Sequence, residues 1–401
     1  MSDERFSRPV IPRGVWALGF VSLCMDLSSE SIHAILPLYL ALGLGASTTT
    51  IGLIEGVAES IALIVRVFSG VLSDVFRRRK PLAVLGYGLG AATKFVFPLA
   101  PSLGWVVTAR FADRLGKGIR GAPRDALIAD ITPPELRGAG FGLRQALDTV
   151  GGFGGPLLAL GAMAYFAGDF RAAFWVAVIP AVVAVALLVL AVEEPKRPSV
   201  QSEDERVRLR LRDVRRLGGR YAMVVAIAAV LTLARFSEAF LVLRAQNVGM
   251  DVAMAPSVMV AMALVYGLTA YPAGVAADRG HGAKLLSFGL LALCAADLVL
   301  AHAAGPLLVY AGGALWGLHM GLTQGLLAAL VAASAPADLR GSAFGMFNLV
   351  SGMALLAASA LAGWLWDAHG PATTFHAGAA FTALAWIALV VYRRSAAWTL
   401  R

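Results

Sequence analysis

Charged residues and cysteines are both scarce in this chain. Only 15% of its 401 residues are Asp, Glu, Lys or Arg, whereas 58% are hydrophobic; a typical soluble domain carries about a quarter charged residues. The two cysteines, Cys24 and Cys294, lie far apart in apolar runs, which argues against a disulfide framework and a cysteine-based metal motif. The sequence also lacks P-loop, HExxH and GxSxG motifs, so we expect no enzyme, no metal site and no cofactor.

Long apolar runs dominate the chain instead. They are about 20 residues long, which is enough to cross a bilayer as a helix, and the 43 glycines suit close packing between such helices. The N-terminus lacks the architecture of a cleaved signal peptide, so the first run is expected to be a retained helix. We predict an all-α integral membrane protein with twelve transmembrane helices. The expected spans are 14–42, 48–73, 81–100, 104–131, 139–166, 171–193, 220–244, 252–277, 283–303, 306–334, 341–366 and 372–392.

Basic residues alternate with these spans. Arg77 to Lys80 separate the second and third spans, Arg137 follows the fourth and Arg340 follows the tenth, whereas loops such as ALGLGAST are almost uncharged. The positive-inside rule therefore predicts a multi-pass protein with both termini in the cytoplasm. The same topology explains the net charge of +9, so no nucleic-acid partner is expected.

Two halves of the chain resemble each other. GVLSD at Gly70 recurs as GVAAD about 204 residues later, and PELRGAGFG at Pro134 recurs as PADLRGSAFG at about the same offset. A weaker echo joins Ser29-Glu30 to Ser237-Glu238. Several matches at one offset indicate a duplicated six-helix unit. The expected domains are a cytoplasmic N-terminus 1–13, a bundle 14–193, a polar cytoplasmic linker 194–219, a second bundle 220–392 and a cytoplasmic C-terminus 393–401.

The segment between the second and third spans resembles the major facilitator superfamily motif G-x-L-a-D-R-x-G-R-K. Gly70, Asp74 and the basic cluster around Arg78 match it, whereas Val75 and Arg77 depart from it. The resemblance covers essentially the whole chain. It implies two pseudo-symmetric six-helix bundles around a central cavity, and a monomer. It also implies a gating role for the motif and its repeat, in which Asp74 and the basic cluster hold the bundles together on the cytoplasmic side. The gating residues expected here are Gly70, Asp74, Arg78, Gly274 and Asp278.

The fifth span carries a run of glycines that ends in Gly155-Pro156. It resembles the G-x-x-x-G-P-x-x-G-G motif of the family's proton-antiporting exporters, with Ala159 and Leu160 in place of the last two glycines. Close helix packing and a proline kink explain the same run without any role in transport direction. We expect Gly155 and Pro156 to act in gating, and the resemblance favours export.

Acidic residues inside the first span indicate a polar cavity. Asp26, Glu30 and His33 follow at i, i+4 and i+7, so they share one face of a helix. A charge in the middle of the membrane costs about 2.5–3.5 kcal/mol, so such residues pair or face water. Asp26, Glu30 and the repeat residue Glu238 are candidate proton-coupling carboxylates. For Asp26, a structural ion pair with an arginine of the fourth span is an equal alternative.

Cations on the fourth span suggest the charge of the substrate. The family expects an R-x-x-x-G-x-G motif here, and its proton-transfer arginine is either Arg110 or Arg114, with Arg110 favoured by its position. Surplus guanidinium groups favour a carboxylate or phosphate substrate, unless nearby aspartates neutralise them. The substrate-binding residues predicted are His33, Arg110, Arg114, Lys117, Arg235, Trp316 and His319, and the proton-coupling set also includes Arg110.

These observations predict a secondary active transporter driven by the proton gradient. The leading hypothesis is antiport that exports a small organic anion, a metal-carboxylate chelate or an amphiphilic drug. The alternatives are a symporter that imports an anionic metabolite or siderophore, a lipid flippase and a non-transporting membrane sensor. The high Ala, Gly and Arg content suggests a bacterial inner membrane.

Overall fold

The computed structural model describes residues 11–76, 78–194, 217–336 and 339–394, and every regular element in them is a helix. The termini and the predicted linker therefore lie mostly outside the described residues. The first half contains α1 Arg13–Leu38, α2 Thr48–Phe76, α3 Arg79–Leu99, α4 Leu103–Ile131, α5 Arg137–Tyr165 and α6 Phe170–Ala191. The second half contains α7 Gly218–Ala234, α8 Ala239–Asn247, α9 Ser257–Ala276, α10 Gly282–Ala301, α11 Pro306–Ser334, α12 Arg340–His369 and α13 Pro371–Arg394.

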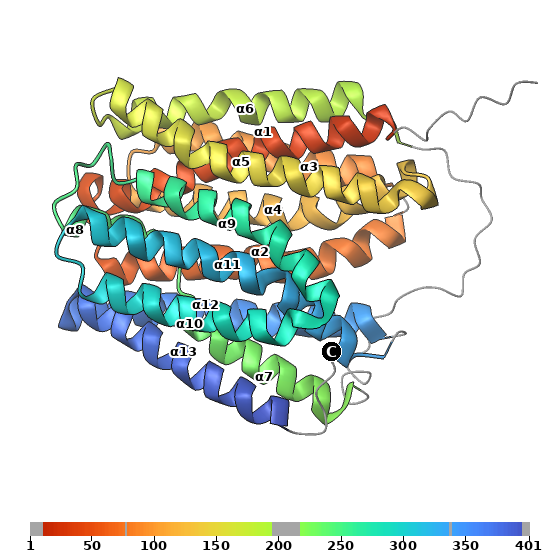
Figure 1. Ribbon diagram of the computed structural model, residues 1–401. Helices are drawn as coiled ribbons and strands as arrows, with labels where there is room; N and C mark the ends of the chain where they lie inside the picture. Colours follow the sequence, from red (N-terminus) through yellow and green to blue (C-terminus); the bar gives the residue numbers. More distant parts are fainter. Residues whose placement is uncertain (1–10, 77, 195–216, 337–338, 395–401) are drawn as a thin grey trace, which may run out of the picture.

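These helices agree with the twelve predicted spans. By length and composition, 9 stretches of the described residues are able to cross a membrane, and one of them, Ser257–Ala301, contains both α9 and α10. The charge-rich helices α2 and α4 are not among the 9, yet they run alongside the others (Figure 1). The bilayer-spanning set is thus consistent with twelve helices, of which the seventh is divided into α7 and α8.

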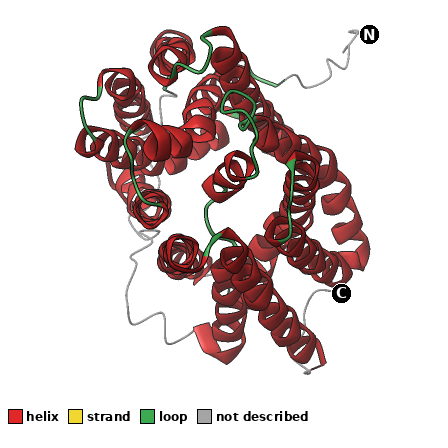
Figure 2. Ribbon diagram, turned by 90° about the vertical axis from the view of Figure 1, so that its left-hand side faces the viewer, coloured by secondary structure: helices red, strands yellow, loops and turns green. Residues whose placement is uncertain are grey.

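The helices form two bundles. In the first, α1 packs against α5 and α6, α4 packs against α2 and α3, and α3 packs against α6. In the second, α11 packs against α9 and α10, α13 packs against α10 and α7, and α12 packs against α7 and α13. Most of the first group lies in the upper part of Figure 1 and most of the second in the lower part, with α9 and α2 where the groups overlap, and Figure 2 shows the molecule from the end at which α8 lies.

The bundles meet mainly at one end. The described helices enter at Arg13 and leave at Arg394 on the same side of the molecule, which we call the terminal end; the other side, near Leu38 and Thr48, is the opposite end (Figure 1). At the opposite end α2 packs on α12 and α1 on α8. Gly52 lies so close to α12 that an added Cβ would be 2.1 Å from the carbonyl oxygen of Ser359. Small residues allow this approach between membrane helices.

The predicted span 220–244 is not one continuous helix. The chain leaves helical geometry between Ala234 and Ala239. One tertiary and one local contact replace lost helical bonds there: the Ser237 amide donates to Ser359 Oγ of α12 at 3.1 Å, and Ser237 Oγ accepts from the nearby Ala239 amide at 3.3 Å. Arg235–Glu238 contains neither proline nor glycine, so no helix-breaking residue predicts this break.

Candidate functional site

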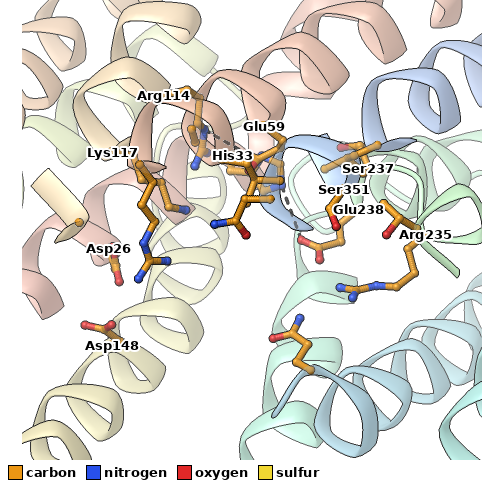
Figure 3. Close-up of a pocket in the computed structure, with 18 of the residues that line it drawn as sticks. Asp26, His33, Glu59, Arg114, Lys117, Asp148, Arg235, Ser237, Glu238 and Ser351 are labelled. Atoms are coloured by element: carbon orange, nitrogen blue, oxygen red, sulfur yellow. Dashed lines mark ion pairs between the residues drawn. The ribbon is translucent and has the colours of Figure 1, made fainter. Parts of the chain in front are cut away.

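A cavity of about 600 Å³ lies between the two bundles. It extends from the α7–α8 break towards the terminal end, where Arg66, Arg144 and Asn348 line it. Such a volume suits a small organic ligand. The charged side chains that line it are Asp26, Glu30, Glu59, Arg66, Arg114, Lys117, Arg120, Arg124, Arg144, Asp148, Arg235 and Glu238, and His33 joins them. Figure 3 shows that they come from both bundles.

The deepest charges of the first bundle are paired. Arg110 Nη2 lies 2.6 Å from Glu55 Oε2, and both side chains are 0% exposed. Lys94 Nζ donates to Asp113 Oδ1 at 2.7 Å. In a medium of low dielectric constant, a buried ion survives only with such a partner.

The cations nearer the terminal end are paired as well. Lys117 Nζ lies 3.7 Å from Glu30 Oε1, and Arg120 Nη2 lies 3.4 Å from Asp26 Oδ1. The remaining pairs are Arg114 with Glu59, Arg66 with Asp125, and Arg124 and Arg144 with both Asp125 and Asp148. The cationic stripe expected on α4 is therefore neutralised by carboxylates, as in the alternative interpretation.

His33 connects this network to the second bundle. Its Nδ1 lies 2.9 Å from Arg110 Nη2, and its Nε2 lies 3.8 Å from Glu238 Oε2 (Figure 3). A guanidinium group only donates hydrogen bonds, so in the neutral imidazole Nδ1 accepts and the proton is on Nε2, the nitrogen that faces Glu238. A titratable chain thus crosses from Glu55 and Arg110 on one bundle to Glu238 on the other.

The break in the seventh span places two charges in the cavity. Arg235 directly follows α7 with φ −103° and ψ 66°, and Glu238 precedes α8. Interrupted helices at the membrane midplane are common at transporter binding sites. Beside them, Trp316 packs on Phe236 with ring centroids 5.4 Å apart. The described residues contain no group of three or more His, Cys, Asp or Glu able to hold a metal ion.

Two predicted substrate contacts are not at the cavity wall. Arg110 is 0% exposed behind His33 and Glu59, and His319 is 0% exposed with its Nδ1 2.8 Å from the Gly289 carbonyl oxygen of α10. From the sequence, both residues could have faced the cavity. The rotation of each helix about its own axis directs these side chains away from it. His33, Arg114, Lys117, Arg235 and Trp316 do line it.

The predicted gating residues occupy several places. Gly155 packs on α1, because an added Cβ would lie 2.6 Å from Glu30 Cβ, and Pro156 lines a smaller hollow beside the main cavity. Gly70 is half-buried on α2, and the side chain of Asp74 lies outside what is described. Arg78, Gly274 and Asp278 are exposed at the terminal end.

Sequence reasoning missed two buried charges. Lys94 lies in AATKFVF and completes the Asp113 pair, while Asp297 lies in CAADLVL and is 0% exposed on α10. Both were visible as lone charges in apolar runs. Glu55, which pairs with Arg110, and Glu59, which lines the cavity, are further acids of α2 that the predicted site did not include.

Comparisons with known proteins agree with this architecture. The family model described as Major Facilitator Superfamily matches residues 18–242 and 224–400. An uncharacterized MFS-type transporter of Methanocaldococcus jannaschii is 32% identical over 386 residues, which is 95% of each chain. The fold resembles that of the nucleoside transporter NupG, with a TM-score of 0.79 and 14% identity over 94% of this chain and 99% of that one. It also resembles an inward-facing bacterial homolog of the human lysosomal transporter Spinster, with a TM-score of 0.76 and 15% identity over 97% and 98% of the chains. This chain is a member of the Major Facilitator Superfamily.

Proposed function

We propose that this transporter couples proton movement to the transport of a small organic solute by alternating access. The observation that carries the proposal is the contact of His33 with Glu238, which joins the two bundles beside the cavity at 3.8 Å. Histidine changes charge near neutral pH. A proton gained or lost in this contact changes how strongly the bundles attract each other.

The carboxylates Asp26 and Glu30 supply a path for protons. Both line the cavity, and their side chains are 21% and 22% exposed. Each is held by a single cation on α4 at 3.4 Å or more, so protonation of either acid also releases that cation. Protonation of Asp26 or Glu30 therefore changes the net charge that the first bundle presents to the cargo.

We propose export by antiport as the direction. The glycine-proline segment that resembles the exporter motif packs against α1 directly at the two carboxylates: added Cβ atoms on Gly151 and Gly155 would lie 3.0 Å from Asp26 Cβ and 2.6 Å from Glu30 Cβ. With the terminal end in the cytoplasm, the cavity is in position to load cytoplasmic cargo. The cargo classes proposed are a small organic anion, a metal-carboxylate chelate or an amphiphilic drug.

Symport of an anion is the second candidate. Arg235 and Glu238 flank the same part of the cavity (Figure 3). An anion held by Arg235 would repel the Glu238 carboxylate unless a proton binds with it. That coupling moves proton and anion in the same direction.

A spin-label experiment tests the proton coupling without knowledge of the cargo. Labels at Glu135→Cys and His281→Cys report the terminal end, and labels at Ser102→Cys and His302→Cys report the opposite end, in a background whose native cysteines are serine. We expect the distance distributions to change between about pH 8 and about pH 5.5.

Variants of His33 and Glu238 test whether the contact between them causes the pH-dependent change. His33→Gln and Glu238→Gln are expected to remove the pH-dependent change, and the exposed Glu193→Gln is the matched control. Distances that do not respond to pH, or that respond equally in Glu238→Gln, contradict the proposal. Once a thermal-shift screen identifies a cargo, proteoliposome flux with opposite pH gradients distinguishes antiport from symport.

A further inference from the structure

We propose that Arg235 is the cargo's anion-binding residue and that the cargo is a carboxylate with an apolar, aromatic-sized body. This inference rests on the second candidate function, symport of a proton and an anion, and names the substrate class of the same cavity. It moves anion recognition from the cationic stripe of α4 to the helix break of the second bundle.

Charge pairing separates Arg235 from the other cations of the cavity. Each lining cation of the first bundle has a carboxylate oxygen within 4.0 Å, from 3.0 Å for Arg144 to 3.7 Å for Lys117. Across the described residues, Arg235 has neither such a carboxylate nor a hydrogen-bond partner for its buried Nε. An unpaired guanidinium inside a membrane protein requires a counter-charge, and the cavity is where an anion reaches it.

The backbone break presents this guanidinium to the cargo. α7 ends at Ala234, so Arg235 leaves the helix and its side chain extends into the space between the bundles (Figure 3). Ser237 and Ser351 lie on the same wall and supply short polar side chains. A guanidinium binds a carboxylate through two parallel hydrogen bonds, which fixes its orientation.

The wall beside Arg235 is apolar and aromatic. Phe236 follows Arg235 in the chain and packs on Trp316 with centroids 5.4 Å apart, and Phe347 and Leu355 add apolar surface to the cavity lining. Trp316 is 1% exposed, and its Nε1–H has no partner among the described residues. A buried indole N–H ordinarily finds an acceptor. An apolar, aromatic-sized body suits this wall.

A matched set of probes tests charge on one scaffold. Purified protein is titrated with benzoate, benzamide, benzylammonium and phenyl phosphate, and affinity is measured by calorimetry and by the shift in melting temperature. We expect benzoate to bind most tightly. Arg235→Gln is expected to weaken benzoate binding about tenfold or more, because hydrogen bonds to a charged group are lost.

Further variants keep the result interpretable. Arg235→Lys retains the charge but loses the two-pronged geometry, so intermediate weakening is expected, and Trp316→Phe is expected to weaken binding severalfold while it keeps the aromatic wall. Arg279→Gln, an exposed arginine outside the cavity, is the matched control and leaves affinity unchanged. Lys117→Gln tests the α4 alternative.

Several outcomes overturn the inference. Equal affinity for benzoate and benzamide removes the anion site, and undiminished benzoate binding in Arg235→Gln with loss in Lys117→Gln returns it to α4. A preference for phenyl phosphate overturns the carboxylate assignment, and a preference for benzylammonium overturns the anionic class. If benzoate does not bind through Arg235, the pH-dependent spin-label distances are unaffected. Failure of this inference is therefore distinguishable from failure of the proposed proton coupling.

Discussion

Glu55 and Arg110 are the most deeply buried ion pair that lies beside the cavity. Their charged atoms are 2.6 Å apart, and neither side chain is exposed to solvent. Some of their polar atoms, Glu55 Oε1 and Arg110 Nε among them, have no hydrogen-bond partner in the described part of the chain. The pair therefore depends on mutual charge neutralisation rather than on a complete hydrogen-bond network, and it also positions His33.

Removal of one member of this pair should destabilise the protein. Glu55→Gln leaves the Arg110 guanidinium with Glu59 at 3.5 Å as its remaining carboxylate, and the expected loss is about 3–5 kcal/mol. The melting temperature in detergent measures it, with the exposed Glu193→Gln as control.

A double substitution checks the cause of that loss. Glu55→Gln combined with Arg110→Met removes both charges and should recover much of the lost stability, because no uncompensated ion remains. Equal melting temperatures for wild type and Glu55→Gln, or additive losses in the double variant, would show that charge pairing is not what holds this position.

At the scale of helices, α2 and α12 close the opposite end of the cavity. The first amides of α2 have no acceptor within their own helix. Asp367 of α12 accepts from two of them, those of Thr48 and Thr49, at 3.1 and 2.7 Å. It also accepts from the Thr49 hydroxyl at 2.6 Å. A carboxylate is favoured at a helix N-terminus by the helix dipole as well as by these bonds. Because the cap comes from the other bundle, it must break whenever the bundles part at this end.

Loss of the cap should favour the state that is open at the opposite end. Asp367→Ala removes interactions worth about 1 kcal/mol, which corresponds to an about fivefold change in the population ratio. Distances between labels at Ser102→Cys and His302→Cys report it. Asp251→Asn is the control, since Asp251 accepts from the Ala253 amide within its own bundle at 2.9 Å. An unchanged distribution in Asp367→Ala would mean that glycine-mediated packing alone closes this end.

At the scale of the whole molecule, the interface between the two bundles has two parts along its length: a packed part at the opposite end and the cavity towards the terminal end. Apolar side chains from both bundles, such as Leu36 of α1 and Leu241 of α8, form one buried cluster. The smaller buried cluster, which includes Leu18 and Tyr87, stays within the first bundle. The molecule is thus held together across the bundles by the larger cluster, and the cavity occupies the rest of the interface.

Labelling of single cysteines should show which end of the molecule faces the cytoplasm. The positive-inside rule predicts that the terminal end faces the cytoplasm. A membrane-impermeant maleimide added to intact cells is therefore expected to modify Ser102→Cys and His302→Cys, and to modify Glu135→Cys and His281→Cys only after permeabilisation. The reverse pattern would contradict both the topology and the loading of cargo from the cytoplasm.

The sequence by itself determined the spans, their duplication and the presence of a polar stripe. A helix that satisfies its own backbone hydrogen bonds in lipid needs only a long apolar run, so the ends of α6 and α11 agree with prediction within a few residues. The face shared by Asp26, Glu30 and His33 follows from helical spacing, which is also local.

Tertiary structure alone decided the partners of those charges. Glu55 with Arg110, Lys94 with Asp113 and His33 with Glu238 each join different helices, and helix rotation, which hydropathy does not encode, sets which side chains meet. The break at Arg235 is also tertiary, since Ser359 of another helix replaces the lost helical bond. Membrane insertion is specified by local composition, whereas charge neutralisation in a low dielectric is specified by contacts between distant segments, so the spans and many cavity residues were readable from the sequence and the pairing of the charges was not.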